Sequence, residues 1–197
     1  FFWSIMLLSA YVQNNRAKHF LGFFMLVAFL LYLSHVLYFK QYVSLYSVFD
    51  SIYVFANLAV YPLYYLYLRL LTVETACKIK NLLHLIPALL FSILSIVFLI
   101  AMDSPYQYFE KRMGINDRAL TVVENFHFQL YVAIRIVFLI QVLYYSIAGL
   151  KLVRSYESRV VEFYSNTEGK SITWARMLLY SFLVTSFSSA LLNFIGR

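Results

Sequence analysis

The chain has 197 residues, of which 62% are hydrophobic, 20% aromatic and 13% charged, and its net charge is +7. A soluble domain has roughly 45–50% apolar and about 25% charged residues, so this composition excludes an ordinary soluble fold and predicts an integral membrane protein. A single cysteine excludes an intramolecular disulfide and a cysteine-rich metal site, and the positive charge lies beside apolar runs, where it orients a membrane protein without a nucleic-acid partner.

The apolar runs predict an all-α, polytopic transmembrane helix bundle that forms a single domain over residues 1–197. A run of about 18 or more apolar residues crosses the ~30 Å hydrocarbon core as a helix, and the missing period-2 alternation disfavours a β-barrel. We expect about six spans here. In chain order they cover residues 1–12 (a helix whose beginning is cut away), 20–39, 45–68, 82–102, 127–150 and 175–194.

The connecting segments predict the orientation of the bundle, because Lys and Arg are enriched in cytoplasmic loops. The first, third and fifth connections hold nine such residues: Arg16, Lys18, Arg69, Lys78, Lys80, Lys151, Arg154, Arg159 and Lys170. The second and fourth hold four, namely Lys40, Lys111, Arg112 and Arg118. We therefore expect loops 13–19, 69–81 and 151–174 to be cytoplasmic, and both chain ends to be external.

Arg135 is the most informative residue inside a predicted span. A charged side chain at that depth costs roughly 2.5–3.5 kcal/mol on insertion scales, so it usually faces the bundle interior. At 100° per residue, a polar stripe is predicted on one side of this helix. The stripe contains Glu124, Tyr131, Arg135, Ser146 and Gly149, with His127 and Tyr145 beside it. We expect it to face neighbouring helices rather than lipid.

Asp50 and Asn57, seven residues apart, share a face of another predicted span that enters from the same side. The stripe and this face together predict a small external pocket for an anionic ligand, lined by Arg135, Glu124, His127, Tyr131, Asp50 and Asn57. The alternative is that Arg135 forms an internal ion pair with Asp50 or Glu124 and only fixes helix register.

Other polar residues indicate no chemistry. His35 and His84 have no His or carboxylate three or four positions further on, so no helical metal pair is predicted and both are expected to form buried hydrogen bonds. Nucleophile motifs and Gly-rich phosphate loops are absent from the sequence. We therefore expect no catalytic residues, no metal, no cofactor and no enzyme activity.

Two stretches carry a resemblance to a known family. Residues 163–174 read FYSNTEGKSITW and are followed by Ala175, Arg176 and an apolar run, while residues 61–67 read YPLYYLY and residues 82–88 read LLHLIPA. These resemble the linker and the "PLxYLY…LLHxIP" pattern of membrane-bound AraC-type transcriptional regulators, which are typical of Bacteroides-like bacteria. The resemblance covers most of the chain.

The resemblance implies a sensory membrane module of about seven helices in the bacterial inner membrane. It would be joined to a C-terminal cytoplasmic helix-turn-helix domain, so DNA would be a partner only through a part that this chain lacks. The lipid bilayer, a small anionic ligand and a second copy of the chain are the other expected partners. A histidine-kinase sensor region, a small multi-span transporter or channel, and a membrane scaffold remain open alternatives.

Overall fold

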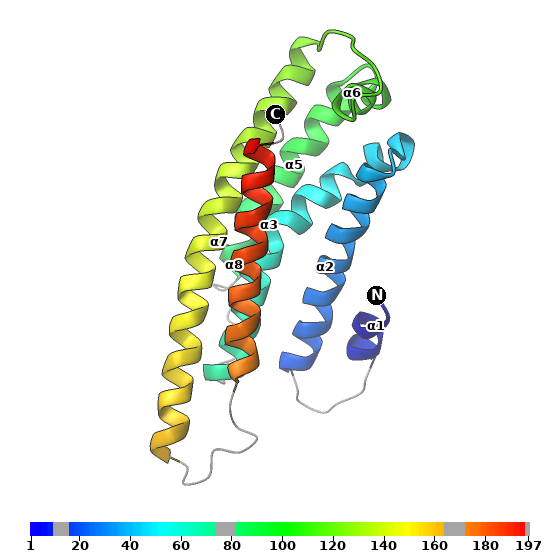
Figure 1. Cartoon of the computed structure of the whole chain (residues 1–197). Coiled ribbons are helices and arrows are strands. Elements are labelled where there is room, and N and C mark those ends of the chain that lie inside the picture. The colour runs from blue at the N-terminus through cyan, green and yellow to red at the C-terminus, as the bar shows by residue number, and fades with distance from the viewer. Residues whose placement is uncertain (10–15, 74–81, 164–171, 196–197) are drawn as a thin grey trace.

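The computed structural model describes residues 1–9, 16–73, 82–163 and 172–195, and these residues form an all-α structure (Figure 1). Its seven α-helices and one 3₁₀ turn are α1 (Phe2–Ser9), α2 (Arg16–Phe39), α3 (Val43–Val73), η1 (Leu83–Leu85), α5 (Ile86–Ala101), α6 (Pro105–Arg112), α7 (Val122–Phe163) and α8 (Thr173–Ile195). The predicted cytoplasmic loops lie partly outside the described residues, at 13–15, 74–81 and 164–171.

Four helices in the described part of the chain are long and apolar enough to cross a bilayer: Ala17–Phe39, Val43–Thr72, Leu83–Ala101 and Val122–Glu162. They confirm four predicted spans, and they indicate an integral membrane protein. The prediction of six visible spans, and seven overall, is wrong for these residues. The predicted first span is α1, whose 8 residues extend only about 12 Å. The predicted last span is α8, which is not among the four and carries Ser181, Thr185, Ser188 and Ser189.

α3 is the central helix of the bundle and packs against α2, α5, α6 and α7. Its middle is buried on nearly every side, from Leu58 to Leu63, which is why the sequence there is apolar all round rather than striped. Side chains of α2 and α7 complete this core, among them Val27, Ile134 and Val142.

α7 is much longer than the span predicted at 127–150. It contains 42 residues, or about 63 Å, which is roughly twice the hydrocarbon thickness. The predicted loop from 151 onwards is therefore wrong as far as Phe163, because this charged stretch continues the helix. Contacts with two neighbours hold it: Arg159 Nη2 donates to the Thr72 carbonyl at 3.2 Å, and Arg176 pairs with Glu157 at 3.5 Å.

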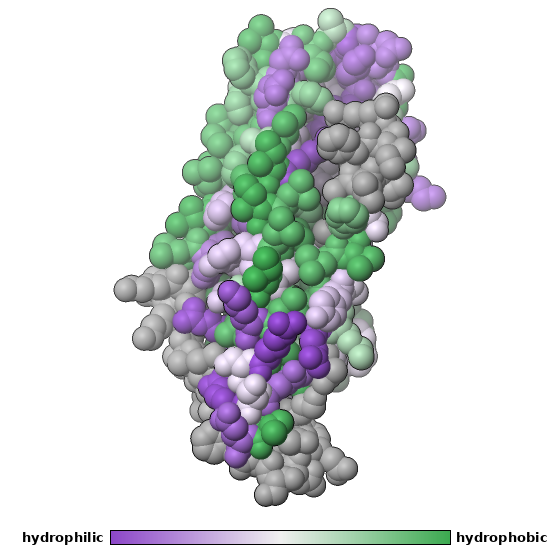
Figure 2. Space-filling model, turned by 60° about the vertical axis from the view of Figure 1, so that its left-hand side comes forward, coloured by the Kyte–Doolittle hydropathy of each residue, from purple (hydrophilic) through white to green (hydrophobic). Residues whose placement is uncertain are grey.

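Figure 2 shows how polarity is distributed over one face of the molecule. Hydrophobic side chains cover a broad region of the long helices, and hydrophilic ones gather towards the lower end and at the upper corner. Large exposed apolar residues such as Ile93, Ile100 and Ile140 belong to the helices that could span a bilayer. Such a surface is expected where lipid rather than water is the solvent.

α6 is a short helix that closes one end of the bundle, which we call the α6 end. Ser104 is its N-cap and accepts a hydrogen bond from the Gln107 amide at 3.5 Å, and Pro105 occupies the first turn. Gly114, with φ of +72°, ends it in a Schellman arrangement in which Ile115 N donates to the Glu110 carbonyl at 2.9 Å. The buried Tyr108 and Phe109 turn one side of α6 into the bundle.

Candidate functional site

Three membrane helices meet beneath α6. α3 begins at this end, α5 terminates here, and α7 begins here, because consecutive spans run in opposite directions. Asp50, Ser95 and His127 each lie about 7–10 Å along their helices from this end. All three side chains are fully buried. The sequence thus places one polar residue from each helix at the same depth.

Asp50 is the centre of the buried polar cluster. Ser95 Oγ donates to its Oδ2 at 2.9 Å, and the Tyr131 hydroxyl donates to its Oδ1. His127 Nε2 lies 3.6 Å from Oδ2. A buried carboxylate is costly unless it is paired and hydrogen-bonded, and these contacts from α5 and α7 meet that need.

His127 connects Asp50 to α6. Its Nε2 is 3.1 Å from Ser95 Oγ, and its Nδ1 is 2.9 Å from the Tyr108 hydroxyl. Edge contacts with the rings of Tyr108, Phe109, Tyr131 and Phe98 surround the imidazole. A continuous hydrogen-bonded chain therefore runs from Tyr108 through His127 and Ser95 to Asp50.

Arg112, the last residue of α6, supplies the positive charge of the cluster. Its guanidinium carbon lies 3.8 Å from the centre of the Tyr131 ring, a close cation–π contact. Nη1 is buried and has no hydrogen-bond partner among the described residues. Arg112 is therefore held by ring stacking and by charge, and one of its donors remains available.

The electrostatic environment keeps Arg112 charged and Tyr108 neutral. Burial lowers the pKa of Arg112, but neighbouring Tyr131, Tyr108 and Asp50 raise it, and the net pKa is above the ordinary value. Burial raises the pKa of Tyr108 to about 12, although Arg112 opposes that rise. Arg112 is thus the positive charge that lies beside the Asp50 carboxyl group.

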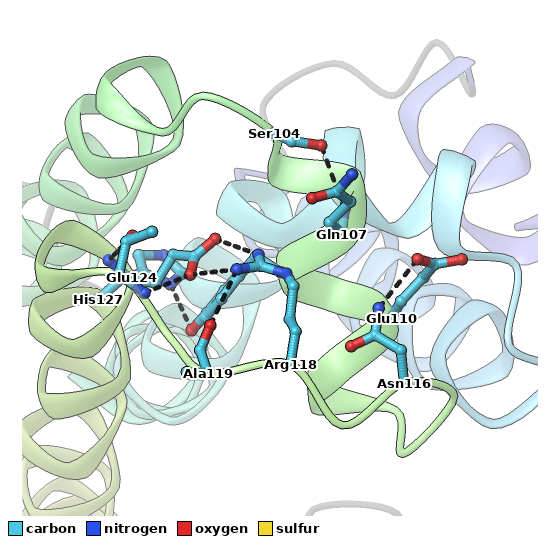
Figure 3. Close-up of polar contacts among 10 residues, drawn as sticks. Ser104, Gln107, Glu110, Asn116, Arg118, Ala119, Glu124 and His127 are labelled. Atoms are coloured by element: carbon cyan, nitrogen blue, oxygen red, sulfur yellow. Dashed lines mark hydrogen bonds and ion pairs between the residues drawn. The ribbon is translucent and has the colours of Figure 1, made fainter.

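A second polar group fixes the start of α7 (Figure 3). Thr121 and Glu124 form a capping box, in which Thr121 N donates to Glu124 Oε2 at 2.8 Å and Glu124 N donates to Thr121 Oγ1 at 3.4 Å. Arg118 reaches from the preceding loop and donates to both Glu124 oxygens, to Oε2 at 3.0 Å. These contacts raise the pKa of Arg118.

The structure brings together three of the six predicted site residues: Asp50, His127 and Tyr131. Glu124 is also buried, but it pairs with Arg118 and caps α7. Asn57 is half-buried, and no hydrogen bond within the described residues joins it to the cluster. Whether these residues bind a ligand stays a prediction.

Arg135 is not placed as expected. Its side chain is exposed on α7, beside the exposed Ile136. The predicted inward stripe is otherwise correct, since Ser146 and Gly149 are buried. On the helical wheel Arg135 lies between Tyr131 and Ser146, which are both buried, so its exposure is not explained by rotation along α7. Of the carboxylates proposed as its partners, Glu124 pairs with Arg118, and Asp50 accepts hydrogen bonds from Ser95 and Tyr131.

Sequence reasoning missed Ser95, Tyr108 and Arg112. Ser95 is one of two serines in an apolar helix, and Arg112 lies in a segment that the sequence analysis treats as a loop. The signal for α6 was present, because Ser104-Pro105 is a typical helix start and Tyr108 and Arg112 are four residues apart on one face. The two histidines assigned to hydrogen bonding do form them: His84 Nδ1 with the Tyr145 hydroxyl and His35 Nδ1 with the Leu31 carbonyl, both at 2.9 Å.

Within the described ranges, no three His, Cys, Asp or Glu side chains are grouped so that they could hold a metal ion. Comparison with known proteins gives no match to a family model, to a curated protein or to a solved structure. The function must therefore be argued from the cluster itself.

Proposed function

We propose that the chain is the membrane-embedded sensing module of a bacterial transcriptional regulator of the AraC-like membrane-bound type, and that it passes an external signal to a cytoplasmic helix-turn-helix domain. The buried Asp50–His127–Arg112 cluster carries the proposal. It joins α3, α5, α6 and α7 at one end of the bundle. Ionisable groups at such depth are expensive in a membrane protein and usually serve a function.

The orientation rests on the distribution of Lys and Arg. The α6 end carries fewer positive residues, and the opposite end carries Lys151, Arg154 and Arg159 on α7. The positive-inside rule favours an external α6 end and a cytoplasmic opposite end. In this orientation the cluster lies near the outer surface, beneath a helix that an external signal can reach.

The long helices provide the route for the signal. From His127 to Phe163, α7 extends about 54 Å without interruption, and α3 extends about 33 Å from Asp50 to Thr72. At the opposite end the two are joined by the hydrogen bond from Arg159 to the Thr72 carbonyl. A change in the cluster would therefore shift two helices whose far ends are tied together, and the attached output domain would respond.

The test uses the natural gene. Asp50→Asn replaces the central carboxylate, and Asp103→Asn replaces an exposed carboxylate at the same end. Transcript profiles of cells carrying each allele are compared after both proteins are shown to be equally abundant in the membrane fraction. The proposal expects a defined gene set to change in Asp50→Asn cells only. Identical profiles in Asp50→Asn and unmodified cells would contradict it.

The main alternative function is a small transporter, and the same two alleles distinguish it from a sensor. A transporter variant changes the uptake of a solute into proteoliposomes that contain only the chain and lipid. A sensor variant changes transcription and leaves such uptake at the level of empty liposomes. A further transmembrane span and a basic helix-turn-helix segment in the reading frame after Arg197 would also favour the sensor.

A further inference from the structure

The hydrogen-bond directions in the cluster follow from counting donors. The single Ser95 hydroxyl proton is donated to Asp50 Oδ2 at 2.9 Å. At 3.1 Å from His127 Nε2, Ser95 Oγ must therefore accept, so His127 carries its proton on Nε2. With its proton on Nε2, a neutral imidazole has a bare Nδ1 that accepts from the Tyr108 hydroxyl at 2.9 Å.

Every donor in the chain points in one direction. Tyr108 donates to His127, His127 to Ser95, and Ser95 to Asp50, while Tyr131 donates to the other oxygen of Asp50. In this arrangement both oxygens of an ionised Asp50 accept a hydrogen bond, and each donor in the chain has an acceptor. A chain in which each member both donates and accepts can also run in reverse, and the reversed form satisfies a protonated Asp50 equally well.

We propose that the ligand sensed at this site is the proton: Asp50 takes up one proton from the α6 side through Tyr108, His127 and Ser95, and His127 changes tautomer as it does so. The inference rests on the proposed sensory function for its biological meaning, but the proton relay itself is a property of the chain alone.

The transfer balances atom by atom. A proton that arrives from the α6 side binds the Tyr108 oxygen, which is fully buried in this structure, as the Tyr108 proton moves to His127 Nδ1. The Nε2 proton of His127 moves to Ser95 Oγ, and the Ser95 proton moves to Asp50 Oδ2. Tyr108, His127 and Ser95 each gain and lose one proton, so the net change is one proton on Asp50. His127 has become the Nδ1–H tautomer.

The charges around the carboxyl decide what the proton does. Four helices contribute polar groups around Asp50: Ser95 from α5, His127 and Tyr131 from α7, Tyr108 and Arg112 from α6, and Tyr46 and Tyr53 from α3 itself. On the side of α2, Tyr46 faces Tyr38 and Tyr53 faces His35. Arg112 is the cation of this set. Once Asp50 is neutral, Arg112 keeps its stacking contact with Tyr131 but loses its counter-charge. α6, which ends at Arg112, is then the element freed to move.

The experiment follows the His127 tautomer by ¹⁵N nuclear magnetic resonance of histidine-labelled chain in lipid bilayers. The chain has four histidines, and the His127 signals are those lost in His127→Gln. We expect the Nε2–H tautomer at alkaline pH and the Nδ1–H tautomer at acidic pH. In Asp50→Asn the switch should vanish, and in the matched control Asp103→Asn it should remain. A single tautomer at every pH, an imidazolium at acidic pH, or a switch that survives in Asp50→Asn overturns the proposal.

A second variant guards against misfolding of Asp50→Asn. Ser95→Ala keeps both Asp50 and His127 and removes only the hydroxyl between them, so it should abolish the switch. Ser92→Ala, one turn away on α5, removes a hydroxyl that donates to the Ser51 carbonyl at 2.9 Å and should preserve it. A switch in Ser95→Ala refutes the relay. Because the readout needs no output domain, a tautomer switch together with unchanged transcription would reject the sensory function and keep the relay.

Discussion

Replacement of Arg112 by methionine is the most informative perturbation of the buried cluster. Methionine retains the apolar stem of the side chain and removes the guanidinium that stacks on Tyr131. Asp50 remains fully buried, with its hydrogen bonds from Ser95 and Tyr131 but without a counter-charge. The variant therefore isolates the contribution of the positive charge.

The expected loss of unfolding free energy is about 2–4 kcal/mol. Removal of one partner of a buried charge pair costs about 3–5 kcal/mol because the other charge stays uncompensated. Arg112 is only half-buried, so solvent reduces this cost. Asp50→Asn in the same background removes the second charge. The double variant should be less destabilised than the sum of the two single variants, by about 2 kcal/mol.

The assay is reversible unfolding in mixed micelles at increasing fractions of denaturing detergent, followed by circular dichroism. Lys111→Met is the matched control, since Lys111 precedes Arg112 and, within the described residues, forms its ion pair with the exposed Asp117 at 3.2 Å. Its expected effect is below about 0.5 kcal/mol. Equal effects of the Arg112 and Lys111 variants, or strict additivity in the double variant, would refute the electrostatic account of the cluster.

Three further predictions use the same unfolding assay. Thr121→Ala removes the cap of α7 and should lower the unfolding free energy by about 1 kcal/mol. Thr185→Ala, on the exposed side of α8, should lower it by under about 0.5 kcal/mol. Equal losses would contradict the capping box. Tyr64→Phe removes the 3.2 Å hydrogen bond to the Ala175 carbonyl, which joins α3 to α8, and should lower the unfolding free energy by about 0.6–1.7 kcal/mol. An unchanged unfolding free energy would contradict this role of the hydrogen bond. Because burial raises the pKa of Tyr108 from 10.0 to about 12, its contribution is complete below the unfolded value and is lost as pH rises towards the folded one. The stability difference between the unmodified chain and Tyr108→Phe should therefore shrink over that interval, and a difference that grows would contradict this sign.

The all-α fold and four spans could be predicted from the sequence because apolar length alone specifies a membrane helix. The same criterion gave the wrong bounds for the first helix and for the end of α7. Phe1–Val12 is apolar, yet the helix described there covers only Phe2–Ser9. The charged segment after Leu150 looked like a loop, yet it continues α7, because Lys, Arg and Glu are good helix formers and contacts with Thr72 and Arg176 support it.

Half of the site was predictable for a geometric reason. Asp50, His127 and Tyr131 lie near the starts of two spans that enter from the same side, and helical periodicity turns them to a common interface. The arginine could not be identified in that way. Arg135 is closer to Tyr131 in sequence and shares its predicted stripe, but its side chain is exposed. Arg112 enters the cluster only because α6 folds back over the bundle, and no periodicity within a span encodes that return.

The central claim is that the cluster at the α6 end controls the helix arrangement at the opposite end, and a distance between spin labels tests it most directly. Labels at positions 158 and 177, both exposed near that end on α7 and α8, are introduced after Cys77→Ser. The account predicts that Asp50→Asn shifts the distance by about 1–2 Å or more, the scale of helix displacements in signalling proteins, while Lys111→Met leaves it unchanged. An identical distance in the unmodified and Asp50→Asn chains would contradict the claim.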